Sequence, residues 1–161
     1  MQIDRNEITY RKIKHDEISL LVDYRLQFLV ELQGLQTKEN EQILRKELTN
    51  YFQTALSDNS FVGWIAELDS VVLGFGGMVI QKIPGNFKLT NGLEGYILNM
   101  YTIPEFRKNG ICDKLIDKLV NEGTELGLNK IYLHASKDGI ELYRKKGFIE
   151  PSLPELELFL K

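Results

Sequence analysis

The sequence predicts an α/β fold in which helices flank a mixed sheet. Segments with strand and helix periodicity alternate along the chain, a hairpin pattern lies near its middle, and strand–helix–strand units follow. The 161 residues are a usual length for one domain, and 43% hydrophobic with 27% charged residues is an ordinary globular composition. We therefore expect a single domain over residues 1–161.

The first part of the chain reads as one strand followed by two helices. In residues 8–13, apolar and polar side chains alternate as in a strand. Asp16 can cap the helix that follows this strand. The apolar face of that helix is expected at Leu21, Tyr24, Phe28, Leu32 and Leu35. Gly34 favours a helix end, and Thr37 can cap a second helix whose apolar face runs over residues 43–55.

A β-hairpin is predicted next. Residues 61–68 are rich in β-favouring side chains, Asp69 and Ser70 form a two-residue reversal, and residues 71–80 return as the second strand. This returning strand contains three glycines, Gly74, Gly76 and Gly77. Glycines inside a strand indicate a bulge or a close approach of another backbone.

The second half is expected to alternate strands and helices. Its elements are a loop at 84–92, a strand at 96–103 stopped by Pro104, a helix at 111–120, a strand at 130–135, a helix at 138–146 ended by Gly147, and closing strands at 148–149 and 155–160. The order of these elements indicates a sheet with both parallel and antiparallel neighbours.

Composition and missing motifs exclude several classes. The net charge of −3 argues against a large nucleic-acid surface, and no stretch approaches the roughly 20 apolar residues of a membrane span. The single cysteine allows no intramolecular disulfide, and two histidines without a His-Glu-x-x-His pattern predict no metal centre. The chain also lacks the P-loop and Gly-x-Ser-x-Gly patterns. We expect a cytoplasmic protein.

One segment carries a chemical signal, ILNMYTIPEFRKNGIC at 97–112. A strand ends, a basic turn with a glycine follows, and a helix begins. The free amide hydrogens of a helix start attract anions, Gly110 lets a phosphate approach the backbone, and Arg107 and Lys108 add positive charge. The turn therefore suits a phosphate or pyrophosphate. The alternative is that Gly110 only shapes the connection and the basic residues are solvated.

Two motifs resemble a known family. The segment RKNGIC at 107–112 resembles the acyl-CoA pyrophosphate loop of the GNAT N-acetyltransferase superfamily, with the pattern Arg/Gln-x-x-Gly-x-Gly/Ala. The segment ELYRKKGF at 141–148 resembles that family's Leu-Tyr-x-x-x-Gly-Phe segment. The order of elements agrees along the whole chain. This sequence departs from the pattern at Cys112, usually Gly or Ala, and at Ser136, where many members carry Asn.

The resemblance implies a mostly antiparallel central sheet flanked by helices, with central strands that splay to admit acetyl-CoA. It implies direct transfer of the acetyl group to a small-molecule or peptide amine, and a backbone amide near Met100 that stabilises the developing oxyanion. The residues that it assigns to acetyl-CoA are Met100, Tyr101, Thr102, Arg107, Lys108, Asn109, Gly110, Ile111, Cys112, Ser136 and Gly139.

The same resemblance gives candidate catalytic and acceptor residues. Tyr143 is the expected general acid for the leaving CoA thiolate, since a phenol with a pKa near ~10 stays protonated at neutral pH. The alternative for Tyr143 is a packing role. His134 could relay a proton, although a lone histidine in a strand is more often simply hydrogen-bonded. The expected acceptor-binding residues are Arg25, Glu31 and Asn99.

Other interpretations stay open at this point. The chain could bind acyl-CoA as a regulatory ligand without catalysis, or it could be a protein-interaction domain with no CoA site. A less favoured mechanism uses Cys112 as an acyl acceptor, since a helix start lowers the pKa of a thiol. A homodimer formed through the exposed last strand is a further expectation.

Overall fold

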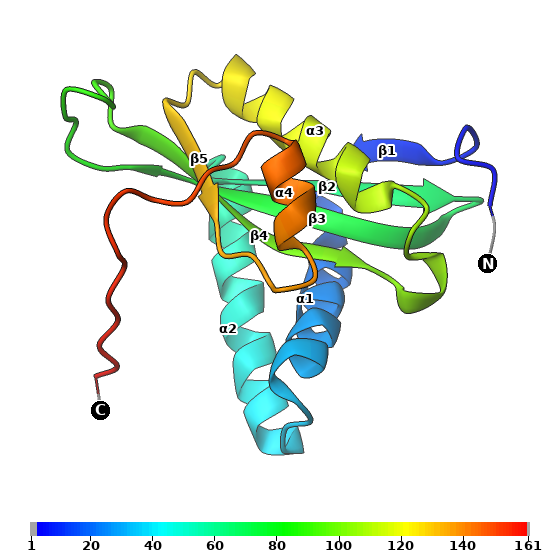
Figure 1. Ribbon diagram of the computed structural model, residues 1–161. Helices are drawn as coiled ribbons and strands as arrows, with labels where there is room; N and C mark the ends of the chain where they lie inside the picture. The colour runs from blue at the N-terminus through cyan, green and yellow to red at the C-terminus, as the bar shows by residue number, and fades with distance from the viewer. Residues whose placement is uncertain (1–2, 161) are drawn as a thin grey trace.

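The computed structural model describes residues 3–160, and a five-stranded sheet forms its middle layer (Figure 1). The strands are Thr9–Lys12 (β1), Phe61–Leu68 (β2), Val71–Lys82 (β3), Leu93–Thr102 (β4) and Lys130–Leu133 (β5). The α-helices are Ile18–Gln33 (α1), Lys38–Ser57 (α2), Ile111–Glu125 (α3) and Ile140–Lys145 (α4), with 3₁₀ turns at His15–Glu17 (η1) and Pro104–Phe106 (η2).

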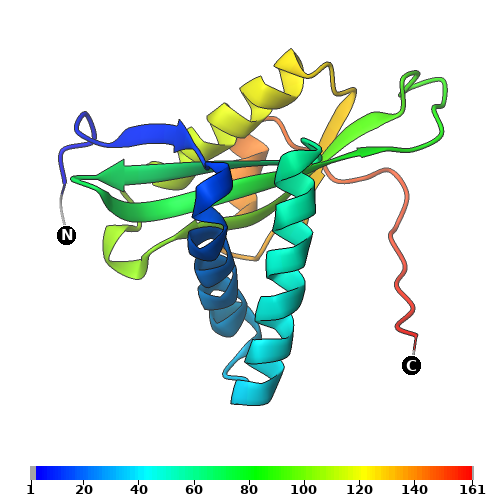
Figure 2. The ribbon, with the colours of Figure 1, turned by 180° about the vertical axis from the view of Figure 1, so that it is seen from behind.

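The sheet is mixed and mostly antiparallel, as the sequence predicted. Its order is β1-β2-β3-β4-β5, and only the last pair, β4 with β5, is parallel within the described strands. A parallel pair needs a crossover, which α3 provides. Helices α1 and α2 cover one face of the sheet, and α3 and α4 lie on the other (Figures 1 and 2).

Apolar side chains fill both sides of the sheet. Between the sheet and the α1–α2 layer, Leu21, Phe52 and Phe75 are fully buried. On the opposite side, Leu115 and Leu119 of α3 are also fully buried. Each such side chain contributes roughly 1.5–3 kcal/mol when it leaves water, so the two layers hold the sheet rigidly between them.

Several local signals in the sequence are confirmed. The Thr37 hydroxyl oxygen accepts a hydrogen bond from the Asn40 amide at 3.2 Å and so caps α2. Gly34 ends α1 with φ 86°. Asp69 and Ser70 have φ values of 49° and 66°, which is the left-handed conformation of a primed hairpin turn.

The start of the first helix was predicted wrongly. Asp16 lies inside the η1 turn and does not cap α1, which begins after Glu17. The Glu17 carboxylate instead accepts the Lys14 amide at 2.8 Å and forms an ion pair with Arg11. The Glu17 carboxylate therefore closes the η1 turn that precedes α1, and it makes no capping hydrogen bond to α1 itself.

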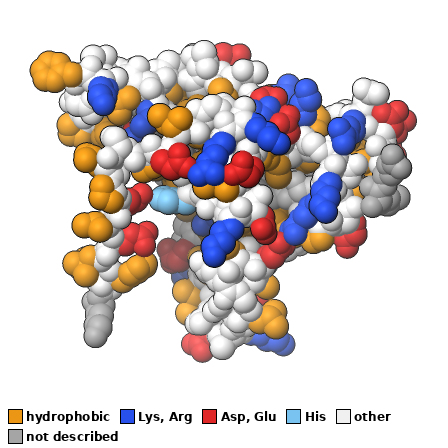
Figure 3. All heavy atoms as spheres, in the orientation of Figure 1, with side chains coloured by type: hydrophobic (Ala, Val, Ile, Leu, Met, Phe, Trp, Pro, Cys, Tyr) orange, Lys and Arg blue, Asp and Glu red, His pale blue; other side chains and the backbone are white. Residues whose placement is uncertain are grey.

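The predicted closing strands are also wrong. Residues 148–160 form no strand in the structure and extend away from the sheet (Figure 1). Six large apolar side chains of this segment are 78–91% exposed, and Figure 3 shows hydrophobic side chains along it. They are Ile149, Leu153, Leu156, Leu158, Phe159 and Leu160. Apolar and polar residues alternate here as in a strand, but no strand among residues 3–160 forms backbone pairs with this segment.

Strands β4 and β5 separate at their C-terminal ends, so the predicted splay is present. Their pairing ends with Ile97 opposite Leu133, whereas β4 continues to Thr102. The register between β4 and β3 shifts near the same point, where Asn99 has a positive φ of 60°. The shift bends β4 away from β5 and opens the sheet.

The glycines of β3 allow a close approach of β4. A Cβ on Gly74 would lie 2.7 Å from the Tyr101 carbonyl oxygen, and one on Gly76 would lie 2.5 Å from Met100 Sδ. The close approach expected from these glycines is confirmed, and it sets the position of the end of β4. Within residues 3–160, none of the helices is both long and apolar enough for a membrane crossing.

Candidate active site

A cleft of about 1060 Å³ lies where the strands separate. Its walls come from α1, the end of β4, the turn before α3, the start of α3, and the segment leading into α4. The sequence-predicted residues among its lining are Glu31, Met100, Tyr101, Thr102, Arg107, Lys108, Asn109, Gly110, Ile111, Cys112, Ser136, Gly139 and Tyr143. Residues from distant parts of the chain therefore meet in one cleft, and their role in binding stays a prediction.

The turn before α3 has a left-handed backbone conformation and lies next to the cleft. Gly110 precedes the helix with φ 79°, and Lys108 is also left-handed at φ 65°. The Asn109 side-chain amide donates to the Phe106 carbonyl oxygen at 3.0 Å and fixes the turn. The first amide hydrogens of an α-helix have no acceptor within the helix, and the first residues of α3 line the cleft at the positive end of the helix dipole.

Arg107 has a partner that the sequence did not reveal. Its Nη2 atom donates to both carboxylate oxygens of Glu31, at 2.6 and 2.7 Å, and its Nε atom donates to the Thr102 carbonyl oxygen at 3.0 Å. The hydrogen bond with Glu31 raises the pKa of Arg107. The cation is therefore held between α1 and the end of β4, beside the turn.

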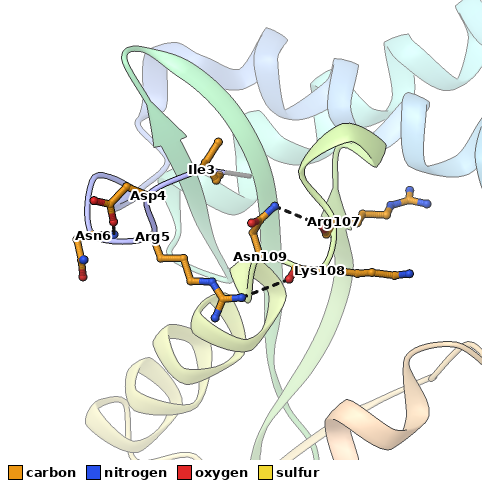
Figure 4. Close-up of a pocket in the computed structure, with 7 residues that line it drawn as sticks. All are labelled: Ile3, Asp4, Arg5, Asn6, Arg107, Lys108 and Asn109. Carbon is orange, nitrogen blue, oxygen red and sulfur yellow. Dashed lines mark hydrogen bonds between the residues drawn. The ribbon is translucent and has the colours of Figure 1, made fainter. Parts of the chain in front are cut away.

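Arg5 supplies a third cation at the turn, beside Arg107 and Lys108, and sequence reasoning missed it. A hollow of about 670 Å³ is lined by residues 3–6 and 107–109 (Figure 4). In this hollow Arg5 Nη2 donates to the Lys108 carbonyl oxygen at 3.4 Å. Arg5 is exposed and lies far from the motif in sequence, so no local pattern could identify it.

Tyr143 lies in a desolvated part of the cleft. Burial raises its pKa to about 12, with a smaller effect of the nearby Cys112 thiol. Its ring packs edge-on against Phe148 with centroids 5.8 Å apart. The phenol therefore keeps its proton across the physiological range and can donate a hydrogen bond into the cleft.

Cys112 is less acidic than its helix position suggested. Burial raises the pKa of its thiol, although the hydrogen bond with Thr102 and the charge of Arg107 act in the other direction. Its Sγ atom lies 3.1 Å from Thr102 Oγ1. The expectation of a lowered thiol pKa is therefore wrong, because desolvation outweighs the hydrogen bond with Thr102 and the charge of Arg107.

Arg25 and Asn99 lie next to the cleft but not among its lining residues. Arg25 Nη1 donates to Asn99 Oδ1, and the Arg25 guanidinium lies 5.9 Å from the centroid of the Phe28 ring, which does line the cleft. Asn99 is only 2% exposed. The two predicted acceptor residues are thus brought together, one from α1 and one from β4.

His134 lies outside the cleft lining. Its Nδ1 atom is 3.0 Å from the Tyr96 hydroxyl, and its Nε2 atom is 3.1 Å from Glu155 Oε2. The structure places it beside the C-terminal segment, and its proton-relay role stays a prediction.

Several apolar residues complete the cleft. Phe28 and Leu32 belong to the predicted apolar face of α1, and Tyr10, Phe106 and Leu142 come from other parts of the chain. Apolar periodicity cannot separate a core position from a cleft wall, because both exclude water. No group of three or more His, Cys, Asp or Glu within residues 3–160 is arranged to hold a metal ion.

Comparison with known proteins gives a consistent result. The sequence pattern of the acetyltransferase (GNAT) family matches residues 26–148. No curated protein sequence matches the chain. The structure is similar to that of a predicted acetyltransferase from Clostridium acetobutylicum solved with acetyl-CoA. That protein is 38% identical, the match covers 94% of this chain and 96% of the other, and the TM-score is 0.85.

Two more distant structures share the fold. Glucosamine-6-phosphate N-acetyltransferase from Arabidopsis thaliana is 20% identical over 94% of this chain and 98% of the other, with a TM-score of 0.70. An aminoglycoside acetyltransferase from an uncultured soil metagenomic sample, solved with sisomicin, is 17% identical over 97% and 98% of the chains, with a TM-score of 0.73. At these identities the likeness concerns the fold alone.

Proposed function

This chain belongs to the acetyltransferase (GNAT) family, and we propose that it transfers an acetyl group from acetyl-CoA directly to the amine of a small molecule or peptide. The observation that carries the proposal is the cleft at the C-terminal end of β4. It brings the turn at 107–112, the free end of β4 and Tyr143 to one place. The similar Clostridium protein contains acetyl-CoA.

The residues of the turn fit the phosphates of acetyl-CoA. Gly110 presents backbone without a side chain, and a Cβ there would meet only Arg5 Nη1, at 3.8 Å, within the described residues. The amide hydrogens at the start of α3 and the cations of Lys108 and Arg5 would hold the pyrophosphate. The free backbone of β4 near Met100 would hydrogen-bond the pantetheine arm.

In the proposed reaction the neutral amine nitrogen attacks the thioester carbonyl carbon. A C–N bond forms and the C–S bond breaks, so that the products are an amide and CoA. A backbone amide near Met100 stabilises the negative charge on the carbonyl oxygen. Tyr143 gives its proton to the sulfur as charge grows there, and the proton lost by the amine returns to the phenol through water, so the charges balance.

An acetyl-transfer assay tests this proposal. Release of CoA thiol is measured with a panel of small amines, free amino acids and peptides, and mass spectrometry locates the acetyl group. We expect at least one amine class to be N-acetylated. Binding of acetyl-CoA without turnover on every amine would favour the regulatory acyl-CoA module instead. A melting temperature that CoA does not raise would favour a protein-interaction domain.

A further inference from the structure

Arg25 is a desolvated cation with no carboxylate partner among residues 3–160. Four other arginines, Arg11, Arg45, Arg107 and Arg144, each form an ion pair. Arg5 forms none in the described part of the chain, but it is exposed to water. Arg25 differs because burial lowers its pKa, and the groups that oppose this effect are the phenols of Tyr96 and Tyr51.

The surroundings of Arg25 do not balance its charge. Burial raises the pKa of both Tyr96 and Tyr51, so both phenols are neutral at pH 7. The hydrogen bond from Arg25 goes to Asn99 Oδ1, which is an uncharged amide oxygen. A desolvated guanidinium beside neutral groups is costly unless an anion joins it.

Asn99 adds a second unsatisfied donor at the same place. Its side chain is 2% exposed, and its Nδ2 atom has no hydrogen-bond partner in the described structure. Because Oδ1 faces the Arg25 guanidinium, Nδ2 is the atom left to donate elsewhere. Buried amide donors are rarely left unpaired in a complete site.

The pair lies beside the proposed reaction centre. Asn99 directly precedes Met100, which lines the cleft, and Arg25 contacts the Phe28 ring, which lines it from α1. A group held by Arg25 and Asn99 would therefore lie only a few bonds from an amine that attacks near Met100. This separation suits a small acceptor that carries both groups.

We propose that the acceptor is an amine that also bears a carboxylate, of the free amino acid class, and that Arg25 with Asn99 binds the carboxylate. This inference rests on the proposed acetyl transfer. A planar carboxylate can accept from the guanidinium and from Asn99 Nδ2 together. One cation surrounded by neutral phenols balances one negative charge, which favours a carboxylate over a doubly charged phosphate.

Matched pairs of compounds test the proposal by binding and by turnover. Each L-amino acid is compared with its own amide, which keeps the amine and removes the negative charge. The amide also represents the N-terminus of a peptide. Phosphoethanolamine and ethanolamine form a further pair for a phosphate. Dissociation constants are measured by calorimetry on the protein saturated with CoA, and acetyl transfer is measured by thiol release.

We expect at least one amino acid to bind more than tenfold tighter than its amide. Arg25→Gln should abolish that difference, and Arg25→Lys should restore part of it. Asn99→Asp places a carboxylate beside Arg25 in nearly the same volume, at a φ that aspartate tolerates, and should also abolish the preference. Arg45→Gln removes the arginine of an exposed ion pair that joins α2 to Asp23 of α1, and it should leave the preference intact.

Each result decides the matter. No preference for any acid over its amide, in binding or in turnover, overturns the proposal, as does a preference that survives both Arg25→Gln and Asn99→Asp. If the only Arg25-dependent preference is for phosphoethanolamine over ethanolamine, the site binds a phosphate and the proposal of a carboxylate is overturned. If amines are acetylated without such a preference, the proposed acetyl transfer is supported and the carboxylate site is overturned. If acids bind in an Arg25-dependent way but are not acetylated, the carboxylate site is supported and the proposed acetyl transfer is overturned.

Discussion

Arg107 and Glu31 form a two-oxygen ion pair across the cleft, with Arg107 Nη2 at 2.6 and 2.7 Å from the carboxylate oxygens. The side chains are 42% and 45% exposed, so the pair contributes at most about 1 kcal/mol to stability. Its main consequence is electrostatic. A carboxylate on α1 neutralises a cation beside the turn proposed for a pyrophosphate.

We expect Glu31→Gln to strengthen acetyl-CoA binding. Removal of one negative charge near a polyanion should lower the Kd about threefold, and less at high salt, because exposed charges are screened. Calorimetry at two ionic strengths measures the effect. Glu41→Gln, which breaks an exposed pair with Arg45, is the control. Weaker binding by Glu31→Gln would mean that the pair positions the turn rather than competing with the ligand.

Gly110→Glu should weaken acetyl-CoA binding more than about tenfold, because it places bulk and negative charge against the phosphates. Gly110 has φ 79°, so the substitution also strains the backbone by about 1–2 kcal/mol. Gly127→Glu separates the two effects. Gly127 has φ 69° and open space around it at the far end of α3. The melting temperature should fall by a similar amount in both variants, but only Gly110→Glu should raise the Kd for acetyl-CoA. Equal Kd values for the two variants would count against the proposed loop.

Tyr143→Phe should lower kcat about 10²- to 10⁴-fold with little change in acetyl-CoA affinity, because it removes a proton donor and keeps the ring. Burial raises the pKa of Tyr143 to about 12, so its donor form persists as pH rises toward that value. The kcat of the wild-type protein should therefore not fall between pH 8 and pH 10. Tyr24→Phe, which alters a core tyrosine packed on Phe75, is the control. An unchanged kcat in Tyr143→Phe would remove Tyr143 from the mechanism. An alkaline decline that disappears in this variant would contradict the raised pKa and not the role as acid.

The parts of the fold that follow from local sequence were predictable. The cap at Thr37, the reversal at Asp69 and the glycine turn at Gly110 each depend on a few neighbouring residues, and the structure contains all three. The final strand was not predictable in this way. Residues 155–160 have a strand's composition, but a strand also needs a partner, and no local pattern contains that information.

The candidate site shows the same limit. The turn at 107–112 and Tyr143 could be found because each lies in a contiguous motif. Arg5 reaches the turn, and Glu31 reaches Arg107, only because the fold brings distant segments together. The pKa of Cys112 was misjudged because a helix start was visible in the sequence and burial was not.

Cys112 should be unreactive and dispensable for chemistry. Because burial raises the pKa of its thiol, less thiolate is present at pH 8 than in a free cysteine. Alkylation by iodoacetamide should be more than about tenfold slower than that of glutathione. Cys112→Ala should keep kcat within about twofold, since alanine suits the family pattern at this position. A large loss of turnover together with a trapped acyl-protein would instead support the acyl-cysteine route.

The exposed C-terminal segment should make the protein a homodimer. Its apolar side chains, Leu156 among them, are far more exposed than a monomer usually tolerates in one stretch, and β5 presents an open edge of the described sheet. Burial of such side chains against a second copy removes them from water.

Light scattering with size-exclusion chromatography measures the dimer, and dilution gives its Kd. Leu156→Glu should weaken association more than about tenfold, because it places a charge in the apolar contact. Leu35→Glu is a matched control, since Leu35 and Leu156 are both 91% exposed but Leu35 lies between α1 and α2. A weak specific contact has a Kd of up to roughly 100 μM. If the wild-type protein is still a monomer at about 100 μM, the segment has no role in self-association.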